Sequence, residues 1–110
     1  MPPQDDSDYH RRAQALLMRI ASSAEDQLGE VAEVELADSV LNVEIDDQMY
    51  VVNKHAPTKQ VWLSSPVSGA WHFAWNPGRS IWLDTRHSQD ILALLAEEWS
   101  SVTGVAVSFG

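Results

Sequence analysis

Apolar residues recur along the chain at two different spacings, and each spacing predicts a different kind of element. Between residues 9 and 27 they recur every three or four positions, which is the period of an amphipathic helix. The inward-facing positions of this helix are Ala13, Leu16, Leu17, Ile20 and Ala24. We therefore predict a helix over residues 9–27, with Ser7 or Asp8 as its cap and Gly29 at its end.

From residue 31 apolar residues alternate with polar ones, which is the period of a strand with one buried face. Glu33 and Glu35 fall on one face of the first such segment, and apolar side chains fall on the other. Turn signals, such as Asp46-Asp47 and Asn76-Pro77-Gly78, separate several more short segments of this kind. The predicted strands are residues 31–36, 40–45, 49–53, 60–64, 71–75 and 80–84.

A second helix is predicted after the last strand, with Ser88 as its cap, Asp90 in its first turn and Gly104 at its end. Its predicted buried face consists of Ile91, Leu92, Leu95, Trp99 and Val102. The apolar segment that follows, residues 105–109, is expected to lie back on the body of the protein.

This order of elements predicts an α+β fold with two layers. Two amphipathic helices would cover one face of a five- to six-stranded, mainly antiparallel sheet and leave the other face open. The 110 residues have room for one hydrophobic core, so we expect a single domain over residues 1–110, with residues 1–7 as a flexible acidic arm.

Charge and composition limit the metal ligands and the binding partners that this chain can have. The chain has no cysteine, so a metal would have to be held by oxygen or imidazole ligands. The net charge is −9, and it belongs entirely to residues 1–47, which hold twelve acidic and three basic residues; the remaining residues hold four of each. A negative field of this kind repels nucleic acid and anionic membranes, and it attracts cations or basic protein surfaces.

The acidic residues gather before the first helix, at its end and along the first strand. Clustered carboxylates suit hard or borderline divalent cations, which they would bind weakly and with water completing the shell. The candidate metal ligands are Asp5, Asp6, Asp8, Glu25, Asp26, Glu30, Glu33 and Glu35, with His10 as an imidazole beside them. Acidic runs are also typical of solvated surfaces that only keep a protein soluble.

A second dense region runs from residue 53 to residue 75 and is rich in tryptophan, histidine and amides. Strand alternation places Trp62 on the same face as Gln60 and Ser64, so Trp62 is expected to be exposed as a protein-binding hot spot. The alternative is that Trp62, Trp75 and Trp82 fill the core. The serines and histidines of this region lack the spacing of a hydrolase or a zinc site.

Residues 53–69 closely resemble the signature of the frataxin family, because the amides, Trp62 and the Ser64-Ser65-Pro66 turn fall in register. The form of this turn is most similar to that of mitochondrial frataxins. The resemblance implies iron binding at an acidic ridge on the first helix and strand, and docking on a cysteine desulfurase–scaffold complex. The residues it assigns to partner binding are Asn53, Lys54, Gln60, Trp62, Leu63 and His72.

Two departures from the family pattern stand out. The middle of the ridge helix, usually acidic, carries Arg11, Arg12, Gln14 and Arg19. His72 stands where mitochondrial frataxins commonly have a basic residue, which would make that contact sensitive to pH.

The resemblance therefore implies a regulator of iron–sulfur cluster assembly that binds Fe²⁺ or Fe³⁺ and modulates sulfur transfer or iron delivery. The alternatives are a ferroxidase and iron store acting at acidic surface sites, and a purely structural adaptor. We expect a monomer that can form iron-dependent oligomers and that binds neither nucleic acid nor membranes. The expected location is the mitochondrial matrix, with the bacterial cytoplasm as the alternative.

Overall fold

The computed structural model describes residues 7–109, which form two helices and one six-stranded sheet. The chain begins with helix α1 and ends with helix α2, and the sheet lies between them in sequence. The elements are α1 (Ser7–Leu28), β1 (Ala32–Leu36), β2 (Val40–Ile45), β3 (Gln48–His55), a short 3-10 helix (Ala56–Thr58), β4 (Gln60–Ser65), β5 (Gly69–Asn76), β6 (Ile81–Asp84) and α2 (Ile91–Thr103).

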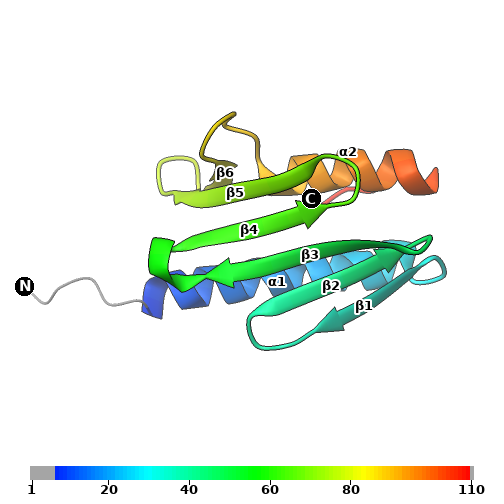
Figure 1. The fold of residues 1–110 in the computed structure, drawn as a ribbon, viewed down its shortest axis with the longest axis horizontal. Helices are drawn as coiled ribbons and strands as arrows, with labels where there is room; N and C mark the ends of the chain where they lie inside the picture. Colours follow the sequence, from blue (N-terminus) through cyan, green and yellow to red (C-terminus); the bar gives the residue numbers. More distant parts are fainter. Residues whose placement is uncertain (1–6, 110) are drawn as a thin grey trace, which may run out of the picture.

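The six strands form a simple meander in the order β1 to β6, and every neighbouring pair is antiparallel. Both helices lie on the same side of this sheet, and within residues 7–109 no helix covers the other side (Figure 1). The predicted two-layer α+β sandwich is therefore confirmed. Ser7 lies inside α1, so the predicted arm cannot extend beyond residue 6, and residues 1–6 lie outside the described part of the chain.

The turn between β2 and β3 is tight because its two residues adopt positive φ angles. In the two-residue turn between β2 and β3, Asp46 and Asp47 both have positive φ angles, 51° and 65°. Aspartate tolerates this left-handed conformation better than most residues, and such turns match the twist of paired strands.

The core lies between the sheet and the helices. Every predicted inward-facing residue of α1 is buried, as are the alternate strand residues that point to the helix side, such as Val43, Val52, Val61 and Phe73. In α2, Ile91, Leu95 and Trp99 are buried as predicted. Leu92 and Val102 are only half-buried. Leu94 and Glu98 are buried instead.

The predicted cap of α2 is wrong. Asp90, rather than Ser88, is the N-cap: its backbone is extended, and its Oδ1 accepts a hydrogen bond from the N–H of Leu92 at 3.0 Å. Ser88 has a positive φ angle of 54° and lies before the helix begins. An N-cap needs an extended backbone two or three residues before the amide that it binds, a position that Asp90 occupies.

The segment after α2 packs against both helices, as predicted. Val107 is buried, and its N–H donates to Ser100 Oγ on α2 at 2.9 Å. The side-chain amide of Gln27 on α1 both donates to and accepts from the backbone of Ser108, at 2.8 and 3.0 Å. This segment therefore joins two helices that are far apart in the sequence. Neither described helix is long and apolar enough to cross a membrane.

Candidate functional site

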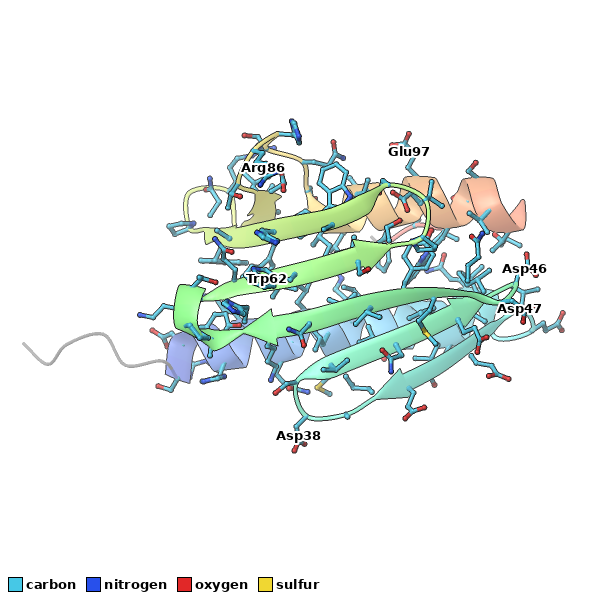
Figure 2. The ribbon with its side chains drawn as sticks, in the orientation of Figure 1. Asp38, Asp46, Asp47, Trp62, Arg86 and Glu97 are labelled. Carbon is cyan, nitrogen blue, oxygen red and sulfur yellow. The ribbon has the colours of Figure 1, made fainter. Side chains whose placement is uncertain are left out.

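The open face of the sheet carries four of the predicted partner-binding residues. Asn53 on β3 is paired with Trp62 on β4, and Trp62 is paired with His72 on β5. Gln60 precedes Trp62 by two positions and therefore shares its face. Figure 2 shows Trp62 on the side of the sheet away from the helices. The sheet register thus gathers these residues into one continuous patch, which we call the docking face (Asn53, Gln60, Trp62, His72) after the role that the family resemblance implies for it.

Trp62 is half-buried because two imidazole rings lie against it. The His55 ring stacks on one side with ring centroids 3.7 Å apart, and the His72 ring stacks on the other side at 4.2 Å, with interplanar angles of 12° and 13°. The indole Nε1 donates to Gln60 Oε1 at 2.8 Å. His55 is itself tied to Thr58 Oγ1 at 2.7 Å. These contacts therefore hold the indole in one orientation.

Sequence reasoning did not find His55 as a member of this stack. It lies at the end of β3 and opposite Gln60, so only the register brings its ring to Trp62. Beside the stack, a shallow hollow of about 200 Å³ is lined by Val51, Ala70 and the docking-face residues Asn53, Trp62 and His72. The docking face thus combines a fixed aromatic ring with a small apolar hollow.

Two of the predicted partner-binding residues do not belong to this face. Leu63 is 2% exposed and lies in the core, because it follows Trp62 and points to the opposite side of the sheet. Lys54 also points to the helix side, where its Nζ donates to Gln14 Oε1 on α1. Strand alternation excludes both side chains from the docking face.

The predicted acidic residues fall into separate groups. Glu33 and Glu35 are exposed on β1, and Glu33 is paired with Glu44 on β2, a third glutamate that sequence reasoning did not include. These three glutamates and Met49 line a common hollow on the open side. Glu25 and Asp26 lie in the last turns of α1, beside Ser22 and Ser23.

The remaining candidates lie elsewhere. Asp8 forms an ion pair with Arg11. His10 packs edge-on against the ring of Tyr9, and Glu30 is exposed just after α1. Asp5 and Asp6 lie outside the described residues. Within residues 7–109, no three histidine or carboxylate side chains converge closely enough to form a metal cage.

The residues that depart from the family pattern on α1 have structural partners. Arg12 lies over the ring of Trp75, 5.1 Å from its centroid. Arg19 donates to the carbonyl of Phe109, and Gln14 accepts from Lys54. These side chains therefore fasten α1 to the sheet and to the segment after α2.

A buried carboxylate explains the Ser-Ser-Pro-x-Ser-Gly part of the signature. Glu98 on α2 is 8% exposed and accepts hydrogen bonds from Ser65 Oγ at 2.6 Å, Ser68 Oγ at 2.5 Å and Tyr50 Oη at 3.1 Å. Ser68 Oγ in turn accepts from Trp71 Nε1 at 2.8 Å. The Glu98 network therefore ties α2 to β3 and to the turn between β4 and β5.

The serines of this turn also shape its backbone. Ser65 Oγ accepts from the N–H groups of Val67 and Ser68, at 3.0 and 3.1 Å. Gly69 follows with a φ angle of 91°, a conformation that few other residues adopt. Burial of the Tyr50 hydroxyl, together with the negative charge and hydrogen bond of Glu98, raises the pKa of Tyr50 well above its ordinary value. The signature turn thus has a structural role that the sequence alone did not reveal.

The sequence matches known proteins along most of its length. The family model of the frataxin-like domain matches residues 2–105. Over 100 residues the chain is 35% identical to the mitochondrial frataxin homologue of Schizosaccharomyces pombe, covering 86% of this chain and 63% of that protein, so it spans less than two thirds of that relative. It is also 35% identical over 106 residues to the iron–sulfur cluster assembly protein CyaY of Neisseria meningitidis, covering 93% of this chain and 92% of that one.

Solved structures show the same architecture. Frataxin from Psychromonas ingrahamii has a TM-score of 0.85 at 24% identity, with 97% of this chain and 99% of that chain covered. Trimeric yeast frataxin from Saccharomyces cerevisiae has a TM-score of 0.75 at 32% identity, with 92% and 84% covered. A yeast frataxin trimer complexed with ferrous iron has a TM-score of 0.71 at 28% identity, with 94% and 93% covered. The signature turn, the meander with its two helices and these matches lead to one conclusion: the chain belongs to the frataxin family.

Proposed function

We propose that this protein regulates iron–sulfur cluster assembly by docking on a cysteine desulfurase–scaffold complex through the docking face, and that it carries iron as a weakly held cargo on its surface carboxylates. The observation that supports docking most strongly is the His55–Trp62–His72 stack on a sheet face that no helix covers. A large aromatic ring held in place beside amides is typical of a binding hot spot.

The relatives support the same pathway. The Neisseria protein is named for iron–sulfur cluster assembly, and one yeast frataxin was solved with ferrous iron. The first half of this chain carries the whole net charge of −9, which favours a basic partner surface and a cationic cargo.

Docking is tested by desulfurase turnover in a reconstituted assembly complex, with the wild type and with Trp62→Ala. Loss of a hot-spot ring costs roughly 2 kcal/mol of binding free energy, so the concentration of this protein that gives half its effect should rise about 30-fold. Trp62→Phe, which keeps a ring between the two imidazoles, should lose much less.

The matched control is Met18→Ala, which removes an apolar side chain that is 53% exposed on α1. It should leave the effect on turnover unchanged. Circular dichroism of each variant checks that it is folded. If the wild type and Trp62→Ala changed turnover equally well, docking through this face would be refuted.

Iron carriage is tested separately, by anaerobic Fe²⁺ titration. We expect the carboxylates of Glu33, Glu35 and Glu44 to supply oxygen ligands on the open side of the sheet, with water completing the shell. Replacing all three with glutamine should weaken the Fe²⁺ affinity about tenfold or more, because it removes the charged ligands.

The control replaces the three turn acids Asp38, Asp46 and Asp47, which Figure 2 shows at the ends of the sheet, with asparagine. This control removes the same amount of charge from the same sheet. Equal weakening by both triple variants would mean that only the overall field attracts iron, and it would refute a site on β1 and β2.

A further inference from the structure

A second surface feature lies on the helix side of the protein, away from the docking face. A cavity of about 230 Å³ opens between α1, the end of β5, β6 and the start of α2. Its apolar lining includes Leu16, Trp75, Trp82 and Ile91. None of the acidic candidates for iron binding among residues 7–109 lines it.

Two arginines of α1 border this cavity. Arg12 and Arg19 are seven residues apart, which places them on the same face of the helix and roughly 10 Å apart along its axis. The Arg12 guanidinium lies over the Trp75 ring, and Arg19 donates to the carbonyl of Phe109. These contacts hold both groups at the cavity, while most of the five N–H donors of each guanidinium remain available.

Neither arginine has a carboxylate partner among residues 7–109, where the one ion pair between described residues joins Arg11 to Asp8. The acid that lines the cavity is Asp90, and its Oδ1 is engaged as the N-cap of α2. The lining therefore holds two cations and one anion. This local excess of positive charge favours an anion at the cavity, although the whole chain has a net charge of −9.

We propose that this cavity binds a small organic carboxylate with an apolar body, of about the size of phenylacetate. A dry cavity of about 150 Å³ can hold benzene, so 230 Å³ has room for a ring and a carboxylate. The ring would pack on Trp75 and Trp82, and the carboxylate would lie between the guanidinium groups, whose planar donors match its two oxygens.

The test is a titration of the ¹⁵N-labelled protein with phenylacetate at pH 7, followed by NMR. The indole N–H signals of Trp75 and Trp82 should shift with a dissociation constant on the order of 1 mM, which is ordinary for a ligand of this size. The indole signal of Trp62, on the opposite face of the sheet, should stay in place and serves as the internal reference. Phenylacetamide, which has the same shape without the charge, should bind at least tenfold more weakly.

Arg11→Gln provides a matched control, because it removes the same charge from the same helix at a side chain that faces Asp8. It should leave the dissociation constant within twofold of the wild type, whereas Arg12→Gln and Arg19→Gln should each raise it about fivefold or more. If Arg19→Gln does not fold, Arg19→Lys takes its place in the titration; it keeps the charge and removes the planar guanidinium. Equal binding of phenylacetate and phenylacetamide, or equal effects of Arg11→Gln and Arg12→Gln, would overturn the proposal.

Discussion

Trp62 and Trp82 are strand residues of the same sheet that face opposite sides. Trp82 is 4% exposed on the helix side, where its ring meets the edges of Tyr9 and Trp75 at centroid distances of 6.3 and 5.6 Å. Trp62 lies on the open side between two imidazoles. The residue type is the same, and the direction of the side chain decides whether the ring lies in the core or at the open surface of the sheet.

The largest expected effect on stability is that of Trp82→Ala. Removing a buried tryptophan leaves a cavity and costs about 3–5 kcal/mol of unfolding free energy. Trp62→Ala removes two ring contacts at a half-exposed site and should cost about 1 kcal/mol. Urea denaturation measures both variants under the same conditions. Similar losses for the two variants would contradict the division of roles between the two faces.

Glu98→Gln should have the next largest effect. The amide cannot accept from three hydroxyl groups as the carboxylate does, and each poorly satisfied buried group costs about 1–3 kcal/mol. Glu97→Gln is the matched control, because Glu97 is exposed on the outer side of α2 (Figure 2). It should change the unfolding free energy by less than about 0.5 kcal/mol. Equal effects would mean that the Glu98 network adds nothing to stability.

The raised pKa of Tyr50 predicts a loss of stability in alkali. The hydroxyl stays protonated in the folded protein at pH values where the unfolded chain ionises, near pH 10. Its contribution is fully present below about pH 10, and stability falls as the pH rises above that value, by up to about 1.4 kcal/mol per pH unit. Denaturation series from pH 9 to pH 11 should show this slope in the wild type. Tyr50→Phe should lose less stability over this pH range, because it has no hydroxyl to ionise. An identical slope in the wild type and the variant would contradict the raised pKa of Tyr50.

The smallest expected effect has the opposite sign and lies on the open side. Glu33 and Glu44 are directly paired across β1 and β2, and like charges in such pairs destabilise a sheet. Glu44→Gln should therefore stabilise the protein by about 0.2–1 kcal/mol in low salt. The gain should largely disappear in 1 M salt, where exposed charges are screened. A loss of stability, or a gain that persists in 1 M salt, would contradict electrostatic repulsion at this pair.

Most of the fold could be predicted from residue spacing. Alternation along β2 and β4 assigns Val43 and Leu63 to the core, and helical spacing assigns Leu17 and Ile20 to the buried face of α1. The same alternation places the side chains of Lys54 and Leu63 on the helix side of the sheet, although the family resemblance assigns both residues to partner binding.

Contacts between distant segments could not be predicted in this way. The His55 ring reaches Trp62 only through the register of β3 and β4. Glu98 looks like one of a pair of solvated acids, although its spacing from Leu94 and Leu95 already places it on the buried face of α2. The residues that donate hydroxyl groups to Glu98 lie 30 to 48 positions before it. Hydrogen bonds over such separations produce no periodic pattern in the sequence.

The segment after α2 has a consequence for how the protein is made. The partners of α1 in this segment are Ser108 and Phe109, 81 and 90 positions after Gln27 and Arg19. A ribosome synthesises α1 before the sheet and α2, so α1 cannot form these contacts until residue 109 has left the exit tunnel. During that interval α1 lacks its hydrogen bonds to this segment, and chaperones and proteases compete with folding for the incomplete domain. Slow codons or translational pausing before residue 109 emerges would lengthen that interval.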